Sequence, residues 1–156
     1  MSQQFPTFSQ HLEISLYKEL YTIGEENTLG KRLKKSRLTL GLSQSELGNL
    51  CNLSRSAING YELDIIFPSK KALLKLGNII DLNYLCSNEY EKFILSDYIK
   101  LLKQWRYENK LSMRGAAKKL GVPSSSYISW EKGIYTINKE NYYKIKSKIQ
   151  LTTKEP

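Results

Sequence analysis

The stretch that decides the fold is LSQSELGNLCNLSRSAINGYE, at residues 42–62. Its pattern returns 69 positions later as LSMRGAAKKLGVPSSSYISWE, at residues 111–131. Repetition at a fixed interval indicates repeated structural units, so we expect two small domains of the same kind in one chain. Aligned without a gap over 29–62 and 98–131, the two copies share eight identical pairs: Lys31/Lys100, Leu33/Leu102, Lys34/Lys103, Arg37/Arg106, Leu42/Leu111, Ser43/Ser112, Ser56/Ser125 and Glu62/Glu131.

Residues typical of helix boundaries divide each copy into short helices. Gly41 ends a helix that begins near Leu29, because glycine readily adopts the left-handed conformation that follows a helix. Ser43 and Glu46 have the spacing of a capping box, and Ser54 has the position of an N-cap. The pattern therefore predicts an all-α protein. The expected helices cover about 29–40, 43–51, 54–63, 69–80 and 82–85 in the first copy, and 98–109, 112–120, 124–132 and 138–149 in the second.

The repeat also sets the expected domain boundaries. An apolar stripe runs from Phe93 to Trp105, so the segment between the copies is either a helix continuous with the second domain or one that restarts at Ser96. The second copy has no obvious fifth helix, which leaves its core incomplete unless another element covers it. We predict an N-terminal arm at 1–28, a first domain at 29–86, a linker at 87–97, a second and divergent domain at 98–150, and a tail at 151–156.

The N-terminal arm has the apolar spacing of an amphipathic helix. Leu12, Leu16, Leu20 and Ile23 recur at intervals of three and four residues, which predicts a helix near 9–21. Such an apolar face must be covered. Three coverings are open: the chain's own domains, including the incomplete second core; a second copy in a homodimer; or another protein.

The chain is strongly basic. It has 24 Lys and Arg against 15 Asp and Glu, a formal charge of +9, although residues 1–28 are net −3. Concentrated positive charge favours a polyanionic partner, either nucleic acid or an anionic membrane. The sequence shows no apolar run near the ~20 residues of a spanning helix and no secretory signal, and its two cysteines are too few for a disulfide framework. We expect a cytoplasmic protein without a membrane segment.

The first copy resembles the helix-turn-helix domain of the lambda and 434 repressor and Cro family, also called the XRE family. The resemblance is carried by LSQSELG at 42–48, SRSAI at 54–58 and the closing Tyr61-Glu62, and the second copy shares it more faintly. It implies tandem lambda-repressor-like domains, in which the helix from Ser43 crosses the DNA backbone and the helix from Ser54 enters the major groove. The implied function is sequence-specific binding of double-stranded DNA by a transcriptional regulator, with repression as the default.

The resemblance assigns DNA contacts to the first copy. Gln44 opens the second helix, where free backbone amides and its own side-chain amide suit a phosphate. Ser54, Arg55 and Ser56 start the helix that enters the groove, and Arg55 can bind a guanine through O6 and N7. Asn59, one turn later, suits adenine or a phosphate.

Basic residues outside this helix are further candidates for phosphate contacts. Lys31 and Lys35 belong to a densely basic first helix, which is either a phosphate-binding surface or simply a solvated face. Arg114 has a similar role in the second copy, near the start of its second helix.

The second copy has a different set of residues on its third helix. Met113 replaces Gln44, and hydroxyl groups replace the arginine and asparagine, so discrimination between bases should be weak. The copy is either a weaker DNA reader or a domain now used for packing. A one-residue shift that aligns Ile128 with Ile58 is an alternative register. The hydroxyl candidates for DNA contact are Ser124, Ser125, Ser126 and Ser129.

Two residue pairs have a structural rather than a DNA-binding role. The resemblance implies a buried ion pair between Arg37 and Glu62, which would fix the third helix to the first. Arg106 and Glu131 repeat the pair in the second copy. A pair of this kind contributes little net stability, but it specifies geometry.

Catalytic patterns are lacking in the sequence. His11 is the single histidine, and no paired-carboxylate, nucleophile or glycine-rich phosphate motif occurs. We expect no enzymatic activity, no cofactor and no metal. Two other functions stay open: a DNA-binding accessory protein of a plasmid or phage, acting at an origin or transfer site, and an antitoxin or protein-interaction module.

Overall fold

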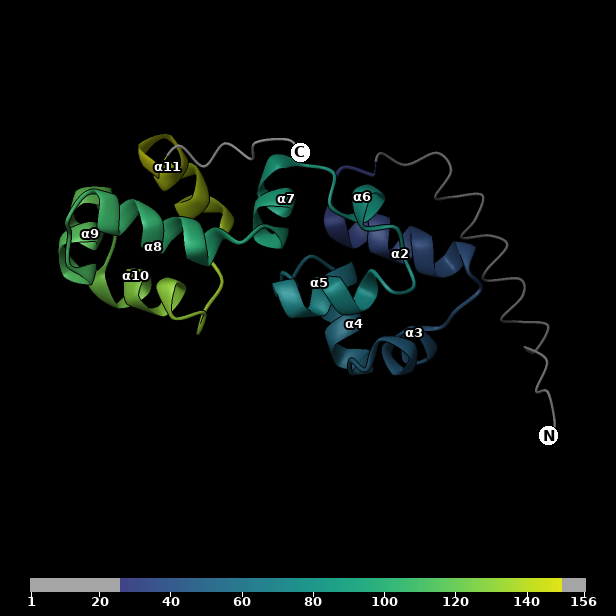
Figure 1. The fold of residues 1–156 in the computed structure, drawn as a ribbon. Coiled ribbons are helices and arrows are strands. Elements are labelled where there is room, and N and C mark those ends of the chain that lie inside the picture. Colours follow the sequence, from purple (N-terminus) through teal and green to yellow (C-terminus); the bar gives the residue numbers. More distant parts are fainter. Residues whose placement is uncertain (1–25, 150–156) are drawn as a thin grey trace. The chain divides into compact units, whose positions relative to one another are not determined.

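The computed structural model describes residues 26–149, and within them the chain is entirely helical, with ten helices and no strand (Figure 1). This confirms the all-α class predicted from the sequence. The helices fall into two compact units, the first ending at Cys86 and the second beginning at Ser87. The helix predicted near 9–21 and the tail predicted at 151–156 lie outside the described residues.

The first unit contains five helices joined by short turns. The helix predicted over 69–80 is shorter than expected, because it ends at Leu76 with Gly77 as its C-cap. The helix bounds are α2 (Leu29–Thr39), α3 (Gln44–Cys51), α4 (Arg55–Glu62), α5 (Lys70–Leu76) and α6 (Leu82–Leu85).

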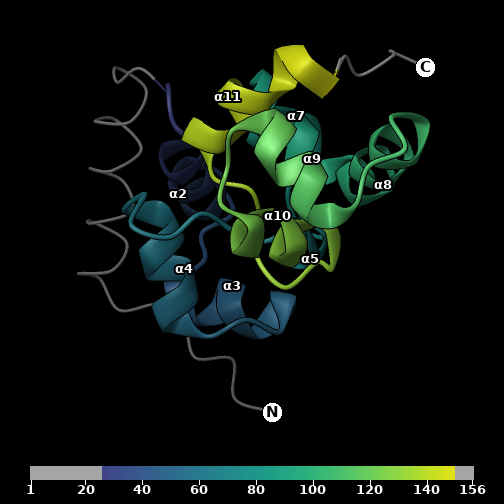
Figure 2. The ribbon, with the colours of Figure 1, turned by 90° about the vertical axis from the view of Figure 1, so that its left-hand side faces the viewer.

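The second unit repeats this order after one additional helix. Its helices α8 to α11 begin 69 positions after α2 to α5, respectively, so the gapless register is the one the structure has. Figure 1 and Figure 2 show that α3 packs against α4 in the first unit and that α9 packs against α10 in the second. The helix bounds are α7 (Glu89–Leu95), α8 (Tyr98–Glu108), α9 (Met113–Leu120), α10 (Ser124–Glu131) and α11 (Lys139–Ile149).

Side-chain caps explain where the helices of the first motif begin. Ser43 Oγ accepts a hydrogen bond from the Glu46 amide at 3.2 Å, and Glu46 Oε2 accepts one from the Ser43 amide at 2.7 Å, which completes the predicted capping box. Ser54 Oγ accepts from the Ala57 amide at 3.0 Å. These bonds satisfy first-turn amides that have no partner within the helix.

The turn between the two motif helices has the same backbone in both units. Asn52 and Gly121 occupy equivalent positions with φ of 50° and 73°, a conformation that asparagine and glycine tolerate best. The next amide then closes the turn: Leu53 donates to the Gly48 carbonyl at 2.8 Å in the first unit. The turn thereby fixes the angle at which α4 leaves α3.

The two cores fill equivalent positions with different side chains. Two tyrosines enlarge the second core where the first has aliphatic residues, and an alanine reduces it at a third position. The Tyr127 hydroxyl, although buried, donates to the Leu102 carbonyl at 3.2 Å. The fully buried pairs that differ clearly in size are Leu47/Ala116, Ile58/Tyr127 and Leu73/Tyr142, and Leu76/Ile145 differs in shape alone.

Helix α7 covers the core that the sequence left without a fifth helix. The Phe93 and Tyr90 rings lie 4.6 Å and 5.6 Å from the Tyr142 ring, and the Tyr90 hydroxyl donates to the Ile137 carbonyl at 2.8 Å. The apolar stripe is not one continuous helix, because α7 ends at Leu95, with Ser96 as its C-cap, before α8 begins at Tyr98. The extra helix therefore belongs to the second unit and completes it from the N-terminal side.

Candidate nucleic-acid interface

The exposed face of α4 carries hydrogen-bonding side chains. Arg55, Ser56 and Asn59 are exposed, and their spacing of one and four positions places them on one side of the helix. Ile58 and Glu62 are buried and fix the other side of α4 to the unit. A helix with one anchored side and one polar side can present these groups to another molecule without rearrangement.

Arg55 differs from the other two polar residues because it is charged. Among the described residues it has no hydrogen bond or ion pair, so its guanidinium is available. Ser54 is also exposed, but its hydroxyl already caps α4. Ser54 is thus better suited to forming the helix than to contacting a ligand with its side chain.

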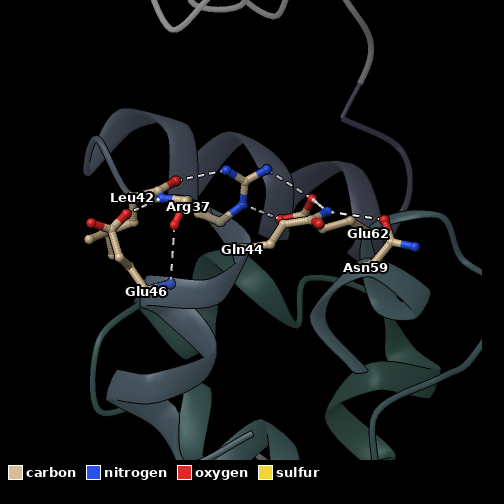
Figure 3. A network of polar contacts seen from close by, with 7 residues as sticks. Arg37, Leu42, Gln44, Glu46, Asn59 and Glu62 are labelled. Atoms are coloured by element: carbon tan, nitrogen blue, oxygen red, sulfur yellow. Dashed lines mark hydrogen bonds and ion pairs between the residues drawn. The ribbon is translucent and has the colours of Figure 1, made fainter. Parts of the chain in front are cut away.

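A buried ion pair fixes the end of α4 to α2 (Figure 3). Arg37 Nε and Nη2 donate to the two Glu62 carboxylate oxygens at 2.5 and 2.9 Å, and Nη1 donates to the Leu42 carbonyl at 2.7 Å. Both side chains are nearly inaccessible, with 8% and 1% of their surface exposed. The planar guanidinium therefore joins α2, the start of the motif and the last turn of α4 in a single fixed geometry.

Gln44 extends this network to the exposed face. Its Nε2 donates to Glu62 Oε2 at 2.8 Å and to Asn59 Oδ1 at 3.2 Å (Figure 3). The first residue of α3 is thereby connected to two residues of α4. The side chain that the sequence assigned to a phosphate thus donates to Asn59 in the structure, and its phosphate contact stays a prediction.

The first turn of α3 still has the features of an anion site. The backbone amides of Gln44 and Ser45 precede the first residue that can bond within the helix, and the positive end of the helix dipole lies there. Both properties favour a phosphate group. The backbone of Gln44 can therefore contact a phosphate while its side chain keeps its bonds to α4.

The second unit contains the equivalent ion pair. Arg106 Nη2 and Nε donate to the Glu131 carboxylate oxygens at 2.6 and 2.9 Å, and Nη1 donates to the Leu111 carbonyl at 3.2 Å. The hydrogen bond from Arg106 holds the pKa of Glu131 below its usual value, although burial opposes this shift. The ionised pair of Arg106 with Glu131 is thus part of the folded state of the second unit.

The exposed face of α10 is built differently from that of α4. Ser124 and Ser125 are exposed, whereas Ser126 and Ser129 are half-buried. Pro123 precedes the helix and provides no side-chain cap. The four predicted hydroxyl candidates thus divide into two that face solvent and two that are partly covered.

Lys31 and Lys35 lie on α2 and are both engaged within the first unit. Lys31 Nζ donates to Asn27 Oδ1 at 3.1 Å, and Lys35 forms an ion pair with Glu26. The hydrogen bond from Lys35 lowers the pKa of Glu26. The positive charge of Lys35 is therefore balanced by a carboxylate, whereas Arg114 in the second unit is exposed without such a partner among the described residues.

Sequence reasoning missed an exposed apolar loop directly after α4 and directly after α10. Ile65 and Ile66 are 73% and 53% exposed in the first unit, and Ile134 and Tyr135 are 61% and 69% exposed at the equivalent positions of the second. The signal was present as large apolar residues in a short turn. Beside a DNA groove, such side chains can pack against sugars and thymine methyl groups.

Residues 26–149 contain no group of three or more His, Cys, Asp or Glu side chains placed to hold a metal ion. Within the same range, none of the helices has the length and apolar character needed to cross a membrane.

Two packed helices joined by a tight turn, with the second helix exposed on one side and held by a buried ion pair, define a helix-turn-helix domain. Comparison with protein families agrees: the helix-turn-helix family model matches residues 33–84 and, a second time, residues 102–155. The chain belongs to this family.

Two curated relatives come from Bacillus subtilis (strain 168). The chain is 36% identical over 56 residues to the HTH-type transcriptional regulator ImmR. This alignment covers 36% of this chain and 44% of that protein. It is 31% identical over 72 residues to the SPbeta prophage-derived uncharacterized HTH-type transcriptional regulator YonR, which covers 45% of this chain and 67% of that protein. No solved structure matches the chain significantly.

Proposed function

We propose that the protein is a sequence-specific double-stranded DNA-binding transcriptional regulator that represses by occupying promoter DNA. The observation that carries the proposal is the exposed set of Arg55, Ser56 and Asn59 on a helix whose opposite side is anchored by a buried ion pair. Membership of the helix-turn-helix family and two relatives named as transcriptional regulators support it. The proposed place of action is the cytoplasm.

In this proposal α4 enters the major groove with its first turn toward the bases. The Arg55 guanidinium binds O6 and N7 of a guanine, a contact that discriminates between bases by about 1 to 3 kcal/mol. Asn59 binds the N6 and N7 edge of an adenine. Its Oδ1 can accept from the base while keeping the bond from Gln44, because a carbonyl oxygen has two lone pairs.

Phosphate contacts orient the reading helix. The first-turn amides of α3 bind one phosphate. Gln44, at the start of α3, donates to Glu62 of α4, and Arg37 holds Glu62 in place, so the bound phosphate fixes the position of α4. Gln44 thus acts through both its backbone and its side chain. The network is present without DNA, so little ordering free energy is lost on binding.

The direct test is selection of bound duplexes from a random pool, followed by sequencing, for the natural protein and for Arg55→Ala. We expect a defined motif that Arg55→Ala relaxes at one base pair. The matched control is Lys71→Ala, which removes one exposed charge from α5 of the same unit and should leave the motif unchanged. Failure of the natural protein to select any motif at low salt would refute sequence-specific binding.

A second candidate function is that of an accessory DNA-binding protein of a mobile element, which the prophage-derived relative favours. It would use the same residues of α4. A reporter gene placed behind the selected motif separates the two functions, because only a repressor lowers expression when it binds there.

A further inference from the structure

We propose that the two units divide the work on DNA: the first reads bases, and the second holds the phosphate backbone without reading sequence. This inference rests on the proposed function, since both roles require a DNA duplex. The partner of the second unit in this proposal is the sugar-phosphate backbone. The residues that contact it lie on α9 and not on α10.

The first argument is the loss of base-reading groups from α10. At the positions equivalent to Arg55 and Asn59, the second unit has Ser124 and Ile128. Hydroxyl groups bond to several bases and phosphates alike, and an isoleucine offers no hydrogen bond. The exposed turn of α10 thus has no side chain that distinguishes a guanine from an adenine.

The second argument is the loss of the network that orients the reading face. Met113 replaces Gln44, so neither the bond to the glutamate nor the bond to an asparagine can form. The pair of Arg106 with Glu131 is retained and still fixes α10 to α8. The second unit has therefore kept its fold and lost the groups that aim a base contact.

The third argument is the position of the cations. The first unit has an arginine at the start of α4, whereas the second unit has its cations on α9, the helix equivalent to α3. Ser45 and Asn49 lie on the exposed side of α3, and their equivalents on α9 are Arg114 and Lys118. Arg55 is replaced in the opposite sense, by Ser124. In a helix-turn-helix, the first helix of the motif crosses the phosphate backbone, so the second unit has placed its cations where phosphates lie.

The availability of these cations also differs between the units. Arg114 and Lys118 are exposed and lie one turn apart on α9, and their side chains have no hydrogen bond or ion pair with the described residues. In the first unit, Lys31, Lys35 and Lys75 are engaged with Asn27, Glu26 and the Asn52 carbonyl, respectively. The second unit thus has two free cations on α9, whereas the equivalent helix of the first unit, α3, has no Lys or Arg.

Total charge agrees with this division. Residues 87–149 contain 13 Lys and Arg against six Asp and Glu, a net charge of +7. Residues 26–86 contain nine against five, a net charge of +4. Neutralisation of phosphates supplies affinity that is independent of sequence and falls with salt, which is the contribution expected from the second unit.

The test uses the full chain and long duplexes that carry the selected motif or a scrambled version, each at several salt concentrations. We expect the double variant Arg114→Ala/Lys118→Ala to weaken binding to both duplexes by the same factor. It should also lower the slope of log affinity against log salt by about 1 for each cation removed. Arg55→Ala should weaken binding to the motif far more than binding to the scrambled duplex.

The matched control is Lys92→Ala/Lys144→Ala, which removes the same charge from α7 and α11 of the second unit. Both lysines are exposed, and their side chains have no hydrogen bond or ion pair with the described residues. The control should keep the salt slope of the natural protein. Circular dichroism at the binding temperature verifies that all variants are folded.

Two results would overturn the inference while leaving the proposed function intact. One is a selected motif in which the base preference at some positions changes in a Ser124→Ala/Ser125→Ala variant, since the second unit would then read bases. If two copies of the protein bind together, their first units select the same base pairs twice. Such a repeated part of the motif is recognised because Arg55→Ala changes it. The other is an unchanged salt slope in Arg114→Ala/Lys118→Ala. Absence of any motif in the natural protein refutes the proposed function instead.

Discussion

Single residues decide whether the buried ion pairs orient a ligand contact or only hold the fold. In the first unit, Glu62 accepts from both Arg37 and Gln44, and Gln44 reaches Asn59 on the exposed face. In the second unit, a methionine at the Gln44 position interrupts this connection. One substitution at the first residue of a helix thus leaves the ion pair without a hydrogen-bonded connection to the exposed face of the unit.

Glu131 predicts a pH dependence of the second unit. Its pKa is lowered in the folded state, chiefly by the hydrogen bond from Arg106, so the folded protein binds its proton less readily than the unfolded chain does. The stability that this carboxylate contributes is present above its unfolded pKa and is lost as the pH falls through the folded pKa. We expect the free energy of unfolding of the second unit to decrease as the pH is lowered below about 4.5.

Glu131→Gln isolates this contribution. At pH 7 the variant should be less stable by roughly 3 kcal/mol, because it leaves a buried guanidinium without its counter-charge. The difference from the natural protein should shrink at acid pH, where the glutamate itself is protonated. Urea unfolding at several pH values measures it, with the exposed Glu140→Gln as the control. A difference that stays constant down to pH 3 would contradict the assignment.

Individual helices depend on caps that can be removed one at a time. Ser54→Ala removes the side-chain bond to the Ala57 amide and should cost about 1 kcal/mol in the stability of the first unit. The motif affinity should fall modestly, because the first turn of α4 carries Arg55. The control is Ser124→Ala, which removes a hydroxyl from a helix that has no side-chain cap. Equal losses in the two variants, measured by urea unfolding, would show that the cap is not the cause.

The helices of the repeat were predictable because their signals are local. Ser43, Glu46 and Ser54 identify helix starts by hydrogen bonds that reach only three residues along the chain. The pairing of Arg37 with Glu62 was implied by the family resemblance, and the structure has this ion pair. The cap signals can be recognised in a single sequence without any knowledge of the tertiary fold.

Features that depend on tertiary contacts were not predictable. The apolar stripe through Phe93 and Tyr98 suggested a continuous helix as one alternative, yet the two rings belong to separate helices that meet at 4.9 Å. The balance of Lys35 by Glu26, nine residues earlier, depends on the path of the chain into α2. Neither the break nor the ion pair has a signature in residue spacing.

At the scale of the whole molecule, the repeat shows what can vary while a fold is kept. The turn backbone, the helix starts and the ion pair are common to both units. The core has exchanged aliphatic residues for tyrosines, and an added helix, α7, packs on Tyr142 through Phe93. The exposed faces have also changed, since Arg55 of α4 has a serine as its counterpart on α10, whereas α9 has cations that α3 lacks. Surface chemistry thus differentiates two copies that share a scaffold.

Separate cores predict that damage to one unit stays local. Leu47 is fully buried in the first unit, and Leu47→Ala should cost about 2 to 5 kcal/mol there by removing packed atoms and leaving a cavity. Amide hydrogen exchange should then lose protection across 26–86 and keep it across 87–149, because the opening of one compact unit need not open the other. The reciprocal variant is Ile145→Ala, which should affect only 87–149. If either substitution lowers protection equally in both ranges, the units unfold as one cooperative body. In that case the second unit would hold DNA only while the first is folded.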